Sequence, residues 1–491
     1  MNNGTALLGR KDGEPDRLQP LLDHLGLLLP DEQERRAFAD CSRTPLPPSL
    51  RINPLIAQAE QLHPTLAERG HPVPWCSNGY AFPAAETRLS HTVEHAAGAY
   101  YLQATAPMLA VETLAPQPGE RVLDLCAAPG GKTTQLAAHM RNSGLLIANE
   151  MSKKRIPALV GNLERCGVGN AVITQAQGTM LARHFHNFFD RILVDAPCSG
   201  DGIVRKDLSM LRYWSPDDAQ RQAQTQTGLL RAAFHMLRPG GTLVYSTCSL
   251  SVEENEHVLL ALLQRYGDAV ELLPVADVAA PPLARAIAAD LPPALGHAAR
   301  VWPHWHDSEG AFVAHLQKRA PTDWPQVASD AHAWLREAAD DRQTLDACRT
   351  LEHLWHVAIP RTADQVVASR GRHLVMQPAA SDSIEEHLPF FVRGGMRFGR
   401  RHRTHFYLTQ QAVALWGHLA TARCVDLEWP QVCALFVGEP IALDRAIDQR
   451  GEIICRYGPW PLCRAMVEEE GTRLNGMLPR PFYRSELRQL V

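Results

Sequence analysis

Short apolar stretches rich in β-branched residues recur through the middle of the chain and predict a parallel sheet. The candidate strands are residues 121–126, 145–149, 171–174, 191–195, 241–246 and 311–316. Polar segments with helical periodicity separate most of these stretches, and this alternation is typical of βαβ units. The block from His91 to about Arg319 therefore predicts a doubly wound, mostly parallel α/β sheet.

The patterns on either side of this block divide the chain further. A helical pattern from about Arg17 to Ala39 and a Pro-rich link predict a small α+β amino-terminal domain over residues 1–95, before a sheet domain over 96–320. Residues 321–385 are polar and rich in Ala and Asp, which predicts a helical connector. Short apolar runs with Gly and Pro turns predict a β-rich domain over 386–491.

Two helix starts can be read from the central block. Ser215 and Pro216 predict a helix that ends before the RPGG turn at 238–241, since Pro favours the first helical position and Gly follows helix ends. Ser251 followed by Glu254 has the spacing of a capping box. We therefore expect Glu253 and Glu254 to serve a helix terminus and not catalysis.

Composition narrows the function classes. The chain has 491 residues, 45% hydrophobic and 21% charged, with a net charge of -4, which argues against a strongly basic coat but leaves room for a local basic groove. No secretion signal and no apolar run of about 20 residues is evident. We expect a cytoplasmic, monomeric protein without a membrane partner, whose thiols stay reduced.

Metal binding is not expected. The eleven cysteines include no CxxC pair, which is the spacing that most zinc sites use. His304 and His306 have near-metal spacing, but no third ligand is evident beside them. We interpret both histidines as structural.

A Gly-rich turn, DLCAAPGGKTT at 124–134, joins the first candidate strand to the next helix. A Walker loop would need Gly at the position of Cys126, and the GxGxxG run of dinucleotide-binding turns is missing. The next strand ends in Asn149 and Glu150, which places a carboxylate where a ribose hydroxyl would lie. Together these features fit S-adenosylmethionine better than NAD.

Two cysteines occupy matching positions after two other candidate strands. Cys198 lies in DAPCSG and Cys248 in YSTCSL, and the carboxyl ends of parallel strands are where ligands bind in such sheets. Methylation of cytosine carbon 5 needs a thiolate that adds to carbon 6, an acid near the N3/N4 edge and a base that removes the carbon 5 proton. Cys248, Asp195 and Cys198 supply these types of group. The other cysteines are expected to be small core residues.

LDLCAAPGGKTTQLA, FDRILVDAPCSGDGIVRKD and RPGGTLVYSTCSLSVEENE, in this order, resemble the RNA cytosine-5 methyltransferases of the Sun/RsmF family. RINPL, YYLQATAPML and VWPHWHDSEGAFVAHL resemble further family blocks, and the end of the chain more weakly resembles a PUA-like RNA-binding region. The resemblance implies a class I methyltransferase fold with an antiparallel last strand. It implies RNA-binding roles for both terminal domains.

The resemblance also assigns roles. The TC-motif thiol, Cys248, would be the nucleophile, and the PC-motif thiol, Cys198, would assist proton removal and release. DNA cytosine methyltransferases instead use a PC cysteine as nucleophile, so the presence of Cys248 favours RNA. Asp195 corresponds to the acid beside both cofactor and cytosine, and Glu150 to the ribose-binding acid. The cofactor loop corresponds to Cys126, Ala127, Ala128, Pro129, Gly130, Gly131 and Lys132.

Other positions depart from the pattern or rest on charge. The family often has an acid near the adenine where this chain has Gln177, whose amide oxygen could accept from the adenine amino group. Arg155, among cations that open a helix against its dipole, is a further cofactor candidate. Candidate RNA contacts are Arg205, Lys206, Arg397, Arg400 and Arg401.

The sequence thus predicts S-adenosylmethionine-dependent methylation of cytosine carbon 5 in 16S ribosomal RNA, with ribosomal RNA or the small ribosomal subunit as partner. A transfer RNA cytosine-5 methyltransferase is an alternative with the same chemistry. A ribosome-assembly factor that binds RNA without catalysis is an alternative from another class. The complete set of Asp195, Cys198 and Cys248 argues against the second alternative.

Overall fold

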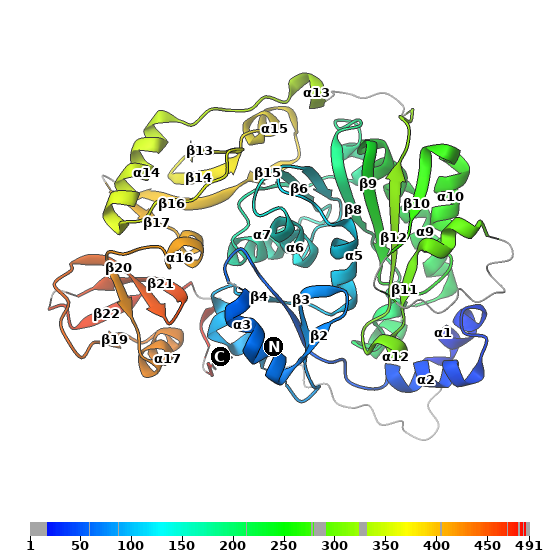
Figure 1. The fold of residues 1–491 in the computed structure, drawn as a ribbon, viewed down its shortest axis with the longest axis horizontal. Helices are drawn as coiled ribbons and strands as arrows, with labels where there is room; N and C mark the ends of the chain where they lie inside the picture. The colour runs from blue at the N-terminus through cyan, green and yellow to red at the C-terminus, as the bar shows by residue number, and fades with distance from the viewer. Residues whose placement is uncertain are drawn as a thin grey trace.

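A central sheet organises the computed structural model, which describes residues 17–57, 59–86, 88–212, 214–275, 278, 291–323, 331–402, 405–468, 470–479, 482–484 and 486–487. The sheet has nine strands, and eight of them follow the order β10-β12-β9-β8-β5-β6-β7-β15, with β11 beside β12 (Figure 1). Their bounds are β5 (Arg121–Asp124), β6 (Leu145–Asn149), β7 (Ala171–Thr174), β8 (Phe189–Asp195), β9 (Leu237–Thr247), β10 (Val270–Leu273), β11 (Ala299–Val301), β12 (Ala311–Lys318) and β15 (Phe391–Gly394).

The strand directions confirm the expected fold class. Strands β9, β8, β5, β6 and β7 run parallel to one another. The strands at both sides are antiparallel, including β12, the expected antiparallel last strand, which pairs with β9. The chain turns from β5 to β6 on one side and to β8 on the other, and ligands of such sheets bind at the carboxyl ends beside this reversal of strand order.

Helices cover both faces of the sheet, which is why its strands are apolar without alternation. Val122 packs with the first layer and Leu123, its neighbour on β5, with the second, and both are fully buried. The first layer comprises α5 (Ala106–Leu114), α6 (Gly131–His139) and α7 (Ile156–Arg165). The second layer comprises α8 (Gly178–Leu181), α9 (Pro216–Met236) and α10 (Glu256–Tyr266). The bounds of α9 confirm the predicted helix.

The first part of the chain forms two helices where one helical pattern was read. Helix α1 (Gln19–His24) and a 3₁₀ turn precede α2 (Glu32–Ser42), because Pro30 interrupts the pattern and Asp31 caps α2 by accepting from the backbone of Gln33. A four-stranded sheet follows, and its last strand lies beyond residue 95. This sheet has the order β2 (His71–Val73), β3 (Cys76–Ala81), β1 (Ser49–Ile52), β4 (Tyr100–Leu102), with helices α3 (Ala59–Arg69) and α4 (Val93–Ala96).

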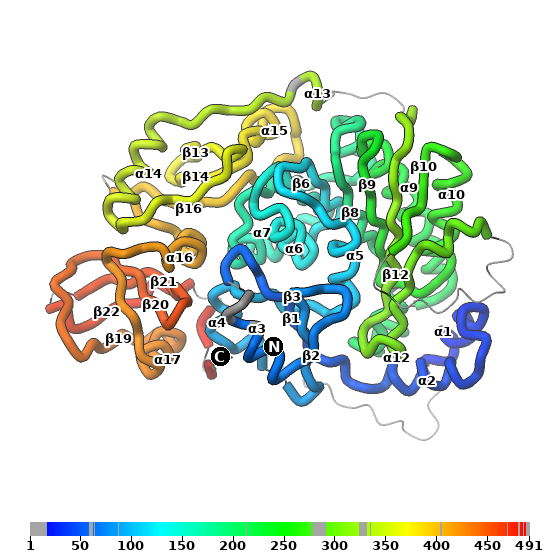
Figure 2. The backbone as a smooth tube through the Cα atoms, viewed as in Figure 1, coloured from blue at the N-terminus to red at the C-terminus, as the bar shows by residue number. Residues whose placement is uncertain are grey.

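Helices α1 and α2 lie far from this small sheet and beside α12 (Pro303–His306), as Figures 1 and 2 both show. Leu21, Leu25 and Phe38 pack there against Val204 and Leu250, which follow β8 and β9. Helices α1 and α2 therefore cover the two segments that carry the candidate cysteines.

Two further β-sheets form the carboxyl-terminal part. The expectation of a helical connector over 321–385 is wrong in part, because two strands of the first sheet lie in it: β-branched residues at 366–367 and 375 suit buried strands better than helix. This sheet has the order β13 (Gln365–Arg370), β14 (His373–Pro378), β16 (Met396–His402), β17 (His405–Leu408). The second has the order β18 (Cys424–Asp426), β20 (Gly451–Tyr457), β21 (Trp460–Val467), β22 (Arg473–Gly476), β19 (Ile441–Ala442).

The remaining helices of this part are α13 (Ala331–Trp334), α14 (Arg342–Trp355), α15 (Ser381–His387), α16 (Gln410–Trp416) and α17 (Trp429–Val437). Strand β15 leaves this part and pairs antiparallel with β7, which joins the carboxyl-terminal part to the central sheet. Among the described helices, none combines the length and apolar character that a membrane crossing requires.

Candidate active site

Four strand ends meet at one edge of the central sheet. Asp195 of β8 is paired in register with Ser246 of β9, two residues before Cys248. The Gly-rich turn follows β5, and Glu150 follows β6. Parallel strands have their carboxyl ends on the same side of the sheet, so the predicted site residues from four separate segments lie at this one end of it.

Asp195 is held by a lysine from the Gly-rich turn. The Nζ atom of Lys132 lies 2.6 Å from Asp195 Oδ2, and the Ser246 hydroxyl donates to Asp195 Oδ1 over 2.9 Å. The Asp195 side chain remains one-third exposed. Lys132 thus connects the cofactor loop to the strand that leads into the first cysteine motif.

The two cysteines meet beside this aspartate. Their sulfur atoms are bonded as a disulfide, their Cα atoms are 6.3 Å apart, and the Cys248 amide donates to the Cys198 sulfur over 3.2 Å. The expectation that all thiols are reduced is therefore wrong for this pair, because the loops bring both sulfurs to one point. The other nine cysteines are free. A nucleophilic Cys248 requires that the pair be reduced to thiols.

Glu150 stands where the Gly-rich turn meets β6. Its carboxylate is almost fully buried, accepts from the backbone of Ser152 over 2.8 Å and of Ala128 over 3.3 Å, and lies 3.3 Å from a guanidinium nitrogen of Arg155. Arg155 also donates to the Ala128 carbonyl. A carboxylate held in this way beside a Gly-rich turn fits the ribose hydroxyls and the charged end of S-adenosylmethionine.

Asn149, for which no role was predicted from the sequence, connects the ends of three strands by hydrogen bonds. Its amide nitrogen donates to the carbonyls of Leu125 and Ala176, each over 3.0 Å, and its oxygen accepts from Thr174 and from the Ala176 amide. The side chain is buried. Its place directly before the candidate ribose acid is the signal that could have identified it.

A second residue that sequence reasoning missed comes from the amino-terminal sheet. Arg51 of β1 is buried and donates to the carbonyl of Gly131 over 3.1 Å and to the hydroxyl of Thr134 over 2.9 Å. Burial lowers the pKa of its guanidinium. Arg51 thereby fixes the first turn of α6, where the cofactor loop ends.

Burial also decides which groups near the turn are reactive. Burial is the main cause that raises the pKa of the Cys126 thiol, so Cys126 is not a third candidate nucleophile. Burial raises the pKa of Asp124 to about 7, although the Thr133 hydroxyl donates to it over 2.7 Å. The Gly-rich turn therefore supplies no thiolate, and its role in binding the cofactor stays a prediction.

Known proteins resemble the chain over nearly its whole length. The model of the 16S rRNA methyltransferase RsmB/F family matches residues 111–317, and that of the N-terminal domain of 16S rRNA methyltransferase RsmF matches 20–105. The ribosomal RNA small subunit methyltransferase F of Vibrio cholerae is 32% identical over 95% of this chain and 98% of its own length. That of Erwinia tasmaniensis is 34% identical over 94% and 96%.

The chain belongs to this family of RNA methyltransferases. A crystal structure of a methyltransferase homolog protein from Pyrococcus horikoshii is also similar, at 32% identity and a TM-score of 0.55, over 62% of this chain and 99% of that one. Members of the family use S-adenosylmethionine, and the residues at the Gly-rich turn fit it. The resemblance predicted from the sequence motifs is thus confirmed.

Four of the five expected RNA-contact residues of this methyltransferase are exposed, and the fifth, Arg205, is buried. Lys206 is 64% exposed, although its Nζ atom lies 3.4 Å from Glu309, and Arg397, Arg400 and Arg401 of β16 are exposed. Gln177, which was predicted to contact the adenine of the cofactor, is exposed at the start of α8. These assignments stay predictions.

No group of residues that could hold a metal ion is found in the described part of the chain.

The expectation for Arg205 does not match the structure. Its side chain is 4% exposed and donates to Asp307 over 2.6 Å, to the Pro45 carbonyl over 3.2 Å and to the Ser308 carbonyl over 3.5 Å. The guanidinium joins three separate segments and is not accessible to RNA phosphates. Its charge is used within the protein because Asp307 and two carbonyls surround it.

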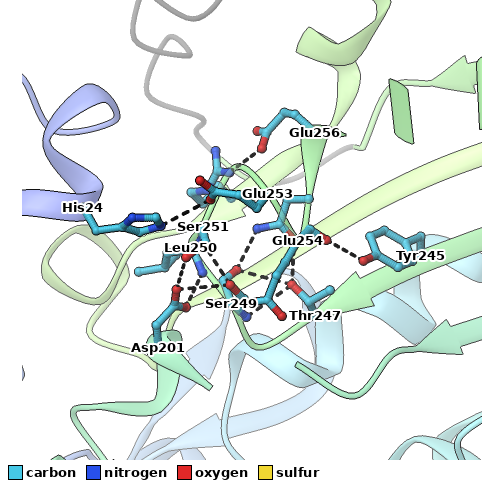
Figure 3. Close-up of polar contacts among 12 residues, drawn as sticks. His24, Asp201, Tyr245, Thr247, Ser249, Leu250, Ser251, Glu253, Glu254 and Glu256 are labelled. Atoms are coloured by element: carbon cyan, nitrogen blue, oxygen red, sulfur yellow. Dashed lines mark hydrogen bonds and ion pairs between the residues drawn. The ribbon is translucent and has the colours of Figure 1, made fainter. Parts of the chain in front are cut away.

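The predicted capping box of Ser251 and Glu254 is also wrong. Helix α10 begins later, at Glu256, and the Ser251 hydroxyl donates to Asp201 of the preceding cysteine loop. Glu254 is fully buried and accepts from Ser199. Glu253 lies 3.2 Å from His24 of α1, and Figure 3 shows this pair. These carboxylates connect loops and do not cap the helix.

Proposed function

We propose that this methyltransferase transfers a methyl group to carbon 5 of cytosine in 16S ribosomal RNA through a covalent enzyme–cytosine intermediate. The observation that carries the proposal is the meeting of Cys248 and Cys198 at the strand ends that also carry Asp195. Two thiols and one acid are the groups that this chemistry needs. The names of the relatives support ribosomal RNA as the substrate.

In the proposed reaction the Cys248 thiolate adds to cytosine carbon 6, so that a carbon–sulfur bond forms and the ring's double bond opens. Asp195 faces the N3/N4 edge, where the ring's electron density moves, and Lys132 and Ser246 keep its carboxyl group in place. Carbon 5 has then become nucleophilic. Bound S-adenosylmethionine supplies the methyl group.

Release requires the second thiol. Cys198 takes part in removing the carbon 5 proton, the electron pair of that bond restores the ring's double bond, and the carbon–sulfur bond to Cys248 breaks. In balance, one methyl group passes from S-adenosylmethionine to carbon 5, which leaves S-adenosylhomocysteine, and one proton is released. A cytosine inside a helix must first be flipped out, which costs a few kcal/mol.

The test uses two variants and a methyl-labelled donor. Cys248→Ala is expected to abolish methyl transfer, because the thiol that adds to carbon 6 is then missing and Cys198 serves the release step in the proposed reaction. Cys198→Ala is expected to retain attack and to accumulate a protein–RNA adduct, visible as a slow band on a denaturing gel. Full turnover by Cys248→Ala, or ready product release by Cys198→Ala, contradicts the mechanism.

The substrate is tested separately. Bisulfite sequencing of total RNA from cells that lack this protein is expected to show loss of a modified cytosine in 16S ribosomal RNA. Loss in a transfer RNA contradicts the proposed substrate, and absence of any loss favours an assembly factor without catalysis. The regions 1–95 and 386–491, with Arg397, Arg400 and Arg401 on β16, are proposed to bind the RNA.

A further inference from the structure

Two buried carboxylates connect the loop that carries Cys198 with the loop that carries Cys248. The Cys198 loop comprises residues 196–202, after β8, and the Cys248 loop comprises residues 248–255, after β9. Each loop contributes one carboxylate, and each carboxylate accepts hydrogen bonds from the other loop. Asp201 comes from the Cys198 loop and Glu254 from the Cys248 loop.

Asp201 holds the residues that directly follow Cys248. It accepts from the hydroxyl of Ser249 over 3.1 Å, from the amide of Leu250 over 2.5 Å and from the hydroxyl of Ser251 (Figure 3). Only 1% of Asp201 is exposed, so water does not compete for these bonds. Three donors on three successive residues fix the backbone of the Cys248 loop.

Glu254 holds the residue that directly follows Cys198. It accepts from the amide of Ser199 over 2.9 Å and from its hydroxyl over 2.5 Å, and Gln226 of α9 donates to it over 2.7 Å. Gln226 also donates to the Pro197 carbonyl over 2.9 Å. Glu254 is fully buried, so the position of Cys198 between its two neighbours depends on this carboxylate.

A purely structural role would not require charge here. Burying a carboxylate is costly, and an apolar side chain of similar volume often serves the fold as well. A carboxylate is, however, a strong acceptor that takes several donors at short distance and fixes their geometry. Reacting groups need placement within about 0.5 Å, which such bonds provide.

We propose that Asp201 and Glu254 are positioning residues for different steps of the reaction. Asp201 sets the Cys248 loop for attack on carbon 6, and Glu254 sets Cys198 for proton removal and release. The division follows from the contacts: each carboxylate bonds to residues adjacent to one cysteine and not to those adjacent to the other. This inference rests on the proposed covalent mechanism.

The experiment compares amide variants of both carboxylates by methylation rate and by the amount of covalent RNA adduct. Glu254→Gln is expected to lower kcat at least tenfold and to accumulate adduct above the wild-type level, toward that of Cys198→Ala. Asp201→Asn is expected to lower kcat at least tenfold without extra adduct, because attack itself is slowed. A purely structural role would not separate the two variants in this way.

Two further variants keep the test informative if Glu254→Gln folds poorly. Ser199→Ala removes one donor to Glu254 and is expected to raise the adduct less, in the same direction. Glu256→Gln is the matched control, because Glu256 is equally buried but pairs with Arg300 over 2.8 Å and contacts neither cysteine loop in the described hydrogen bonds. It is expected to lower the melting temperature without raising the adduct.

The outcomes separate this inference from the proposed function. If Cys198→Ala forms no adduct, the covalent mechanism fails and the inference fails with it. If Cys198→Ala forms adduct while Glu254→Gln and Ser199→Ala do not, only the role of Glu254 is overturned. Adduct accumulation by Asp201→Asn or by Glu256→Gln overturns the division between the two steps.

Discussion

Gly202 is the position at which a single methyl group should separate the two cysteine loops. Its amide donates to the Cys248 carbonyl over 2.9 Å, and its carbonyl accepts from the Gly310 amide over 2.8 Å. A Cβ on Gly202 would lie 2.5 Å from the Cys248 oxygen and 2.6 Å from the Gly310 oxygen. Both neighbours are backbone atoms, so neither can rotate away as a flexible side chain would.

The structure sets the size of the effect. Ordinary contact begins at 3.4 Å, so Gly202→Ala requires the Cys248 carbonyl to move by about 0.9 Å or the substituted residue to move by as much. Overpacking of this kind costs roughly 1–3 kcal/mol of stability. A displacement of about 1 Å at reacting groups costs about 100-fold in rate. We expect the single-turnover rate of methyl transfer to fall by about 30- to 100-fold, with a lower melting temperature.

The assay is methyl transfer to 16S ribosomal RNA under single-turnover conditions, together with thermal unfolding. Gly228→Ala is the control, because Gly228 lies within α9 and has no atom within 4 Å of its Cβ position. Ala is favoured over Gly by about 1 kcal/mol in a helix interior, so this variant should be active and at least as stable as the wild type. A Gly202→Ala enzyme with wild-type rate and melting temperature would refute the reasoning.

Two further predictions concern protonation and oxidation of the site. A hydrogen bond with Glu253 raises the pKa of His24 above its ordinary 6.5, so the stability that His24 contributes is complete below pH 6.5 and is lost as pH rises through the raised pKa. Hydrogen exchange of α1, corrected for the intrinsic rise of amide exchange with pH, should therefore quicken as the pH rises above 6.5 through the raised pKa, and His24→Gln should remove that dependence. The disulfide of Cys198 and Cys248 blocks the nucleophile, so protein oxidised with diamide should be inactive and a dithiol, which gives up two electrons, should restore activity. Equal rates of oxidised and reduced enzyme would contradict the assignment of Cys248.

The site's main residues could be predicted from the sequence because strand ends are local signals. Buried parallel strands read as continuous apolar runs, and a polar residue that ends such a run, as Asp195 and Glu150 do, must lie at the sheet edge. The convergence of Cys198 and Cys248 followed from this rule alone. Which thiol attacks did not follow from it, since both stand in the same kind of setting.

Residues whose partners are distant in the sequence could not be assigned in this way. The spacing of Ser251 and Glu254 fits a capping box, but their hydrogen-bond partners, Asp201 and Ser199, lie about 50 residues earlier. Arg205 carries the charge that an RNA contact needs, but its guanidinium donates to Asp307, which lies 102 positions later in the chain. A local pattern reports what a side chain can do, and the tertiary structure decides which partner satisfies it.

The two cysteine loops are contacted by Asp201 and Glu254, by Gly202 and by helices α1 and α2. Several distant parts of the chain therefore hold these loops in place. Loops carry backbone polar groups that must be satisfied and have no strand ladder to hold them. Here Asp201 and Glu254 accept hydrogen bonds from the two loops, and Gly310, directly before β12, donates to Gly202. Leu21 of α1 and Leu25, which follows it, pack against Val204 and Leu250. Loosening any of these supports should therefore affect catalysis before it affects binding of S-adenosylmethionine. Other residues hold the cofactor loop, Arg51 at Gly131 and Asn149 at the preceding Leu125, and the contact of Lys132 with Asp195 joins the two regions.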